Sequence, residues 1–304
     1  MLAALWKWKA LNTASVATEF FGSPLCDHAY RRVRRLARAG LVCLEPIRRW
    51  LHGDVWILTL QGFANVQEGL PEMKEAGFRS EALAHDYLCT AVQRGPWLGA
   101  IPAGVELVSE QELRRLGPDH LPSWVPSTEI HRPDGYSRLP VKGRAEIVSF
   151  EVELSCKHES FYRTVARFYH DTQSVFRVIW MVPTASAADR IQAMLGRTVP
   201  QSKRLHDFVL LPDFLKQGWH ARFVLGYEAG RPLTDLLENG VSPPCLPGDS
   251  LLLLNLRKRP YKSKDSKSRT KAPFRNRLVT TVQATQTPVP QAPFKSLQLS
   301  IELR

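Results

Sequence analysis

Hydrophobic residues return with two different spacings along the chain. In residues 1–70 they recur every three or four positions, as Ala29, Val33 and Leu36 do, which is the period of an amphipathic helix. Beyond residue 80, short apolar runs of strand length alternate with helical stretches. The pattern predicts an α/β protein with a mainly helical part at residues 1–70 and an α/β part at residues 80–230.

The α/β part can be divided into elements. Because helices alternate with strands, we expect at least some parallel strand pairing. The expected helices are Ser80–Arg94, Glu110–Leu116, Lys157–His170 and Ala185–Leu195, and the expected strands are Val105–Val108, Ile130–Leu139, Ala145–Leu154, Val175–Val182 and Asp207–Leu211. After Pro244 the periodicity fades into polar residues and proline, so residues 245–304 are expected to form a basic, mostly disordered tail.

The composition is that of a protein with true hydrophobic cores, since 44% of the 304 residues are hydrophobic. The five cysteines are far apart and form no CxxC pair and no Cys/His cluster with metal spacing, which predicts neither disulfides nor a zinc site. Lys7 and Lys9 interrupt the apolar start, and no apolar run approaches the roughly 18 residues of a membrane span. We therefore expect a cytoplasmic protein without a membrane partner.

The net charge of +12 indicates a polyanionic partner, and most of it is concentrated in the tail. Between Arg257 and Arg277 there are ten basic residues and one acidic residue, a local charge of +9 that begins with Arg257, Lys258 and Arg259. A tail that only improves solubility is the alternative. Contact with nucleic-acid phosphates is favoured.

A short turn joins two predicted helices in the N-terminal part. Asn12 or Thr13 can cap the first of them, and Gly22 is a favoured stop for it. Ser23 can cap the second, with Pro24 at its first position. The spacing therefore predicts a helix-turn-helix.

The second of these helices has an apolar face and a basic face. The basic face carries Arg31, Arg32, Arg34, Arg35 and Arg38, and Asp27 is the only acid between Pro24 and Val42. A helix that reads the DNA major groove must bury one face while the other contacts phosphates and base edges. The pattern thus predicts a DNA-recognition helix, with a solvated charge face or a protein-binding surface as alternatives.

Two strand-like segments follow between Leu41 and Phe63, and they are expected to meet in a turn at His52-Gly53-Asp54. Thr59 can cap the next helix, and Gly62 allows close packing. A hairpin behind a helix-turn-helix predicts a winged helix.

Acidic residues cluster along two neighbouring segments of the α/β part. Glu151 and Glu153 are spaced by two and share one face of a strand, while the opposite face is apolar. Buried carboxylates need a metal ion or a basic partner. If Asp134 on the preceding strand converges with them, the three could hold Mg²⁺ or Mn²⁺, with Lys157 close to a scissile phosphate. The alternative is a salt-bridged strand in which Lys157 is the carboxylates' partner.

Several short motifs carry a resemblance to a known family. RPDG, FEVELSCK and FYRTVARFY resemble the PD-(D/E)xK nuclease superfamily and, within it, the plasmid replication-relaxation family with its MobC-type relaxase-like members. RRVRRLARAGLV, WILTLQGF and the helix SEALAHDYLCTAV are similar to that family too, so the resemblance covers roughly residues 10–225. It implies an N-terminal winged helix plus a restriction-endonuclease-like domain, and a bacterial protein that nicks or relaxes DNA at a plasmid origin or transfer origin.

The chain departs from the superfamily pattern, in which lysine follows the acid after one spacer. Here Glu153 takes that place and lysine comes at Lys157. Two hypotheses follow: a metal-dependent nickase that uses Asp134, Glu151, Glu153 and Lys157, or a non-enzymatic origin-binding protein with a silent nuclease-like domain. A covalent tyrosine among Tyr136, Tyr162 and Tyr169 and the oligomeric state stay open, and we expect His85 to be a packed or hydrogen-bonded histidine.

Overall fold

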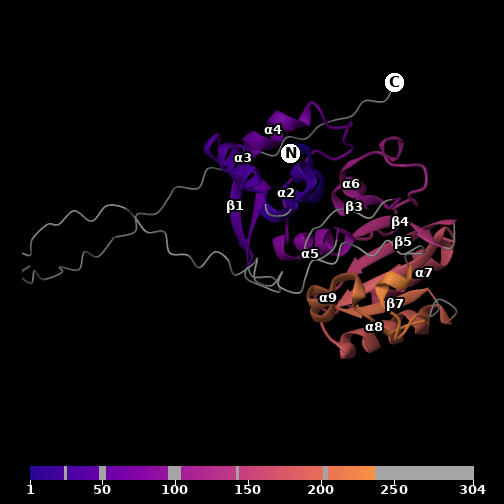
Figure 1. The fold of residues 1–304 in the computed structure, drawn as a ribbon. Coiled ribbons are helices and arrows are strands. Elements are labelled where there is room, and N and C mark those ends of the chain that lie inside the picture. The colour runs from indigo at the N-terminus through magenta and orange to yellow at the C-terminus, as the bar shows by residue number, and fades with distance from the viewer. Residues whose placement is uncertain (24–25, 48–52, 95–103, 142–143, 201–204, 237–304) are drawn as a thin grey trace, which may run out of the picture. The chain divides into compact units, whose positions relative to one another are not determined.

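The computed structural model describes residues 1–23, 26–47, 53–94, 104–141, 144–200 and 205–236. These residues form a mixed α/β structure, as the hydrophobic pattern predicts (Figure 1). The predicted tail, with Arg257, Lys258 and Arg259, lies outside the described residues.

The N-terminal part contains four helices and a hairpin among the residues described. Leu11 pairs with Trp56 in an isolated bridge that adds a third, very short segment to the hairpin. The helices are α1 (Leu2–Trp8), α2 (Thr13–Phe21), α3 (Asp27–Arg38) and α4 (Leu60–Gln67), and the antiparallel strands are β1 (Val42–Ile47) and β2 (Gly53–Leu58).

Local capping explains where these helices begin and end. The Asn12 side chain accepts a hydrogen bond from the backbone N–H of Ser15 at 2.7 Å, and α2 ends at Gly22 with a left-handed φ of 70°. Thr59 caps α4 in the same way. A Cβ at residue 62 would lie 1.8 Å from the carbonyl oxygen of Leu41, so only glycine fits there. These predictions are confirmed.

Two local predictions in this part were wrong. The third helix begins at Asp27 with Cys26 as its N-cap, instead of beginning directly after Ser23. Gly53 and Asp54 already belong to β2, because the ladder pairs Gly53 with Ile47. His52, the first residue of the predicted turn, lies outside the described residues.

The second part is built on a six-stranded sheet with the order β3-β4-β5-β6-β7-β8. Its first three strands form an antiparallel meander, β5, β6 and β7 are parallel, and β8 is antiparallel to β7. The strands are β3 (Glu106–Ser109), β4 (Gly135–Val141), β5 (Arg144–Val152), β6 (Val175–Val182), β7 (His206–Leu210) and β8 (Phe223–Leu225), and the helices are α5 (Leu83–Arg94), α6 (Glu110–Arg115), α7 (Glu159–Asp171), α8 (Ala185–Thr198) and α9 (Leu211–Gln217). The predicted parallel pairing is confirmed.

Each face of the sheet has its own hydrophobic core. On one face, Leu88 and Val92 of α5 pack with Phe150 and Val152 of β5. On the other face, α7 and α8 pack around Trp180 of β6. Figure 1 shows α5 between the N-terminal elements and the sheet. The alternation predicted for β5 is thus confirmed, because Phe150 and Val152 face α5.

The strand expected from Ile130 begins only at Gly135, because Pro133 has no N–H to donate to a ladder. Asp134 therefore lies immediately before β4, where its backbone N–H donates to the carbonyl oxygen of Phe150 at 3.1 Å. The end of β5 and the start of β4 are thus side by side.

The N-terminal part is attached to α5 through polar contacts. The Asn12 amide donates to the Tyr87 hydroxyl oxygen at 2.7 Å, and the Thr90 hydroxyl donates to the carbonyl oxygen of Trp8 at 3.0 Å. Arg94 pairs with Glu19 of α2. Of the helices described, none has both the length and the apolar composition that crossing a bilayer requires.

A buried histidine in the sheet generates a prediction about pH and stability. Burial lowers the pKa of His206 to about 3, and its Nδ1 accepts a hydrogen bond from the Trp180 indole at 3.1 Å. Above the ordinary histidine pKa the His206 side chain is neutral in both the folded and the unfolded chain, and its full contribution to stability is present. As the pH falls from there toward 3, the His206 imidazole gains a proton only in the unfolded chain, so the free energy of unfolding decreases.

In His206→Gln the amide oxygen can still accept from Trp180, but nothing titrates. Between pH 6.5 and about pH 5, the unfolding free energy of the wild type should therefore fall by roughly 2 kcal/mol more than that of the variant. Urea denaturation at the two pH values measures the difference. Equal losses in both proteins would contradict a neutral, buried His206.

Candidate functional site

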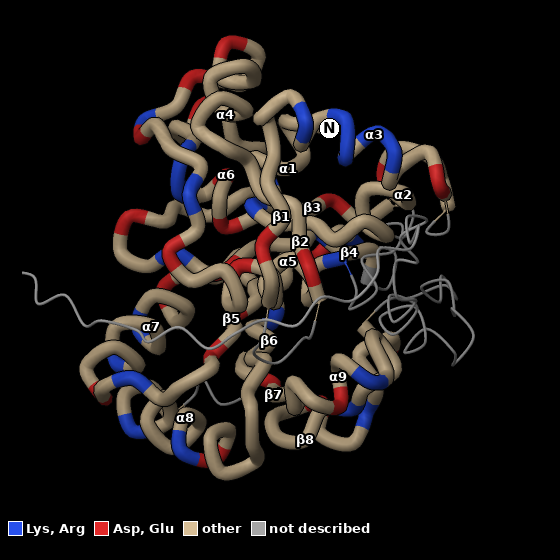
Figure 2. The backbone as a smooth tube through the Cα atoms, turned by 90° about the vertical axis from the view of Figure 1, so that its left-hand side faces the viewer, with Lys and Arg blue, Asp and Glu red and all other residues tan. Residues whose placement is uncertain are grey.

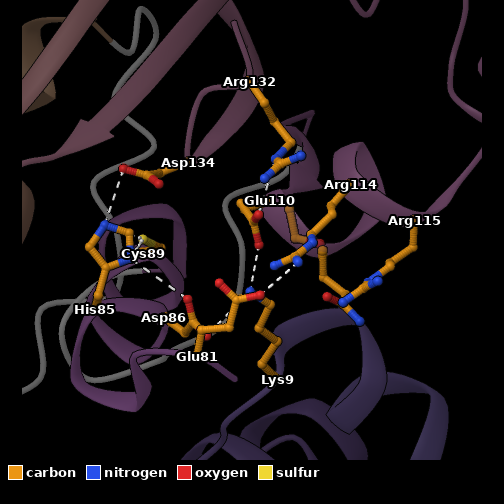
Figure 3. Close-up of polar contacts among 12 residues, drawn as sticks. Lys9, Glu81, His85, Asp86, Cys89, Glu110, Arg114, Arg115, Arg132 and Asp134 are labelled. Atoms are coloured by element: carbon orange, nitrogen blue, oxygen red, sulfur yellow. Dashed lines mark hydrogen bonds and ion pairs between the residues drawn. The ribbon is translucent and has the colours of Figure 1, made fainter. Parts of the chain in front are cut away.

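Asp134 lies between the end of β5 and the start of α5. Its Oδ2 accepts a hydrogen bond from the backbone N–H of Val152 at 2.7 Å and lies 3.5 Å from Nε2 of His85. Burial opposes ionisation of this carboxyl group, but the His85 imidazole and the Val152 N–H outweigh it and lower the pKa of Asp134. Asp134 is therefore an ionised carboxylate with a histidine beside it (Figure 3).

Glu151 points to the opposite face of the sheet, toward α7. His131 Nε2 lies 2.7 Å from its Oε1, and the hydroxyl group of Tyr169 donates to the same oxygen. Burial lowers the pKa of His131, but the Glu151 carboxylate outweighs it and raises that pKa above its ordinary value. The buried Glu151 carboxylate thus has a basic partner and a hydroxyl partner inside the protein.

Glu153 follows the last residue of β5 and is 4% exposed. Lys157 Nζ lies 3.3 Å from its Oε2 and 4.1 Å from the centre of the Phe161 ring. Burial raises the pKa of Glu153, and the positive charge of Lys157 offsets only part of that rise. The carboxylate that Lys157 contacts is that of Glu153, as a salt-bridge partner.

The three predicted metal ligands therefore lie at the ends of two paired strands, but each is engaged by a different protein group. Asp134 contacts His85, Glu151 contacts His131 and Tyr169, and Glu153 contacts Lys157. Carboxylate oxygens suit Mg²⁺ or Mn²⁺ in chemical type. These contacts do not leave the three acids arranged as a ready-made Mg²⁺ site, because a shared ion would have to displace the present partners.

A different group of ligand-type atoms comes together. In the described part of the chain, His85, Cys89 and Asp134 each place one such atom within 4.8 Å of the other two. The sequence interpretation that no cysteine and histidine share metal-type spacing needs correction here. His85 and Cys89 are four residues apart on α5, so they lie on one helix face, and a search for CxxC pairs does not detect that spacing.

The three candidate tyrosines are buried. Burial raises the pKa of Tyr136, Tyr162 and Tyr169, with nearby carboxylates adding to it. Tyr162 accepts a hydrogen bond from the backbone N–H of Lys157 at 3.0 Å. The geometry gives Tyr162 and Tyr169 structural contacts with the acidic segment and does not single out a nucleophile.

A buried ion cluster lies next to His85. Lys9, at the end of α1, places Nζ 3.2 Å from Asp86 Oδ2 and 2.6 Å from Glu110 Oε2. Glu110 also pairs with Arg132 at 3.1 Å, and Asp86 Oδ1 lies 3.6 Å from His85 Nδ1. Figure 3 shows these side chains as one continuous set that leads from α1 to Asp134. Sequence reasoning missed the cluster, because its members come from four separate segments.

The recognition helix predicted from the sequence is α3. Ala29 and Val33 are buried, whereas all five predicted arginines are exposed: Arg31, Arg32, Arg34, Arg35 and Arg38. Figure 2 shows the basic residues of α3 as blue segments along this helix. Arg34 also lies over the Tyr30 ring at 5.8 Å. The helix has the buried face and the basic face that a groove-reading helix needs.

No protein-family model, no curated protein and no solved structure matches this chain.

The Lys9 cluster generates a prediction about stability. In Lys9→Met, Asp86 and Glu110 lose the cation that they share in a buried place, and breaking such a pair costs about 3–5 kcal/mol. Lys7→Met is the matched control, because Lys7 is also on α1 but is 30% exposed and pairs with Glu112. It should cost about 1 kcal/mol or less. Denaturant unfolding of both variants tests the difference, and equal costs would show that the Lys9 cluster is not a stabilising contact.

Proposed function

We propose that this protein binds DNA in a sequence-directed way and that α3 is its recognition helix. The observation that carries the proposal is the two-sided character of α3, with five exposed arginines opposite a buried Ala29 and Val33. The major groove is about 12 Å wide and admits one helix, whose exposed arginines can contact guanine edges and phosphates. A surface that only keeps the protein soluble usually mixes charges, whereas α3 carries one acid, Asp27, at its first turn.

The order of elements around α3 supports a winged helix. α1 is followed by the short bridge of Leu11 to Trp56, then by α2 and α3, and then by the β1-β2 hairpin. In such an arrangement the hairpin lies beside the recognition helix and can contact the DNA backbone. The tail beginning at Arg257, Lys258 and Arg259 would add a contact that does not depend on sequence.

For the α/β part we propose the restriction-endonuclease-like fold that its motifs resemble. Two observations support it: helices cover both faces of the sheet, and the backbone of Asp134, just before β4, is paired with the end of β5, the segment that carries Glu151 and is followed by Glu153. The same resemblance makes a plasmid origin or a transfer origin the proposed DNA partner, in a bacterial cytoplasm.

Two roles compete for this α/β part. Metal-dependent nicking by Asp134, Glu151, Glu153 and Lys157 is supported by the place of Lys157 beside Glu153. The non-enzymatic role, a DNA clamp or scaffold, is supported by the protein partners that each carboxylate already has. We favour the non-enzymatic role, because those partners supply the compensation that buried carboxylates require.

The DNA-binding proposal makes a prediction about three arginines. Replacing Arg31, Arg34 and Arg35 by Ala should remove the preference for the cognate duplex over a random one, since each bidentate base contact provides about 1–3 kcal/mol of discrimination. Competition binding at fixed salt, with a duplex from the proposed plasmid origin and a random duplex of equal length, measures the ratio of the affinities for the two duplexes.

The matched control replaces three exposed arginines of the α/β part, Arg163, Arg167 and Arg190, and removes the same charge. This control variant should lower the affinities for the cognate and the random duplex by the same factor or leave both unchanged. The ratio of the two affinities should therefore stay at the wild-type value. If the control abolishes discrimination while the α3 variant keeps it, α3 is not the reading element.

The choice between the two roles generates a separate prediction. With Mg²⁺ or Mn²⁺, the purified full-length protein should bind supercoiled plasmid carrying the origin but leave it supercoiled on an agarose gel. The nickase hypothesis requires the opposite: open circles that appear with metal and disappear in Asp134→Asn and Glu151→Gln. That result would establish the enzyme and show that the acids exchange their protein partners for a metal.

A further inference from the structure

His85, Cys89 and Asp134 form a compact set of three different ligand types. His85 and Cys89 come from neighbouring turns of α5, and Asp134 approaches from the start of β4. His85 Nε2 lies 3.9 Å from Cys89 Sγ and 3.5 Å from Asp134 Oδ2. An imidazole, a thiol and a carboxylate therefore converge with atoms close enough to share one ion.

We propose that these three side chains bind a zinc-class divalent cation. In a tetrahedral zinc site the metal lies about 2.3 Å from sulfur and about 2.0–2.2 Å from nitrogen or oxygen, so neighbouring ligand atoms are roughly 3.3–3.6 Å apart. The two distances from His85 Nε2 are within a few tenths of an ångström of that spacing. The third pair, Cys89 Sγ and an Asp134 carboxylate oxygen, lies within 4.8 Å, so side-chain rotation on metal binding would have to shorten that distance.

The ligand set also selects the class of metal. Thiolate and imidazole ligands favour zinc-class ions, whereas Mg²⁺ takes oxygen ligands alone. On binding, the metal would displace the proton of the Cys89 thiol and that of the His85 imidazolium to solvent. The resulting thiolate and the Asp134 carboxylate would balance a divalent charge, with a neutral imidazole as the third ligand. The site is therefore different from the Mg²⁺ site expected at Asp134, Glu151 and Glu153, although the two share Asp134.

The surroundings of His85 fit a metal ligand. Asp86 Oδ1 lies 3.6 Å from Nδ1, on the side of the ring away from Asp134, and Asp86 is itself held by Lys9. A carboxylate behind a histidine orients its ring and strengthens it as a ligand. The hydrogen bond that His85 Nε2 makes with the carbonyl oxygen of Val152, at 3.0 Å, is the contact that a metal would replace.

Two of the three proposed ligands also border a small cavity. Cys89 and Asp134 line a small cavity together with Lys9, Asp86 and Glu110, and it has room for a water-sized group. His85 and Asp134 are partly exposed, at 28% and 17% of their side chains. A cation can therefore enter from solvent, and a water can complete a site with three protein ligands.

The proposal does not rest on DNA binding, because none of the three residues belongs to α3. Cobalt(II) is the probe, since it takes the place of zinc and reports a thiolate ligand by charge-transfer absorption in the near ultraviolet. The metal-free full-length protein is titrated with Co²⁺ under reducing conditions. We expect one equivalent to produce the thiolate band together with visible bands typical of tetrahedral cobalt, and zinc to abolish both.

Cys89→Ser should lose the thiolate band, and His85→Gln and Asp134→Asn should each weaken Co²⁺ binding by about tenfold or more. Cys43→Ser is the matched control, because Cys43 is a partly buried cysteine on β1 that is not one of the three proposed ligands, and it should keep the wild-type spectrum. Circular dichroism of each metal-free variant confirms folding.

The proposal is overturned by a wild-type protein without a thiolate band, or by a band that persists in folded Cys89→Ser. It is also overturned if Mg²⁺ displaces Co²⁺ from the protein at the same concentration at which zinc displaces it. Loss of DNA binding in the α3 arginine variants with an unchanged cobalt spectrum leaves the metal site established, so the two proposals can fail separately.

Discussion

The buried ammonium group of Lys9 is the contact on which the arrangement of this protein depends. It lies at the end of α1 and binds Asp86 of α5 and Glu110 of α6, so it connects the N-terminal helices to the two helices next to the sheet. Lys9 has a φ of 57°, which a side chain other than glycine rarely adopts. Such strain persists only where the surrounding contacts hold it. In this protein the ion pairs of the Lys9 ammonium group with the Asp86 and Glu110 carboxylates are such contacts.

This contact places the N-terminal part and the acidic residues in one framework. Asp86 pairs with Lys9 on one side and lies beside His85 on the other, and His85 in turn approaches Asp134. The chain of contacts thus runs from Lys9, at the end of α1, to Asp134, immediately before strand β4. Two side chains, those of His85 and Asp86, thus link the Asp134 carboxylate to the Lys9 ammonium group.

Much of the fold could be predicted, because local patterns determine it. The spacing of Ala29, Val33 and Leu36 correctly indicated which face of α3 is buried, and alternation along β5 correctly placed Phe150 and Val152 toward α5. Strand β6 matched its apolar run from Val175 to Val182. The errors lie at boundaries, where Pro133 delays β4 and Cys26 rather than Ser23 precedes α3. Element ends depend on tertiary contacts, which the sequence pattern does not contain.

The site was harder to predict, because the partner of a buried charge comes from elsewhere in the chain. The sequence indicated that Glu151 and Glu153 need compensation, but it offered only Lys157. The fold supplies His131 and Tyr169 to Glu151, and His85 to Asp134, from segments 18 to 49 residues away. Three carboxylates arranged to share a metal ion repel one another in the metal-free protein. Three carboxylates that each have a separate protein partner are compensated without any metal ion. The distribution of partners, more than the presence of acids, therefore distinguishes a catalytic site from a stabilised one.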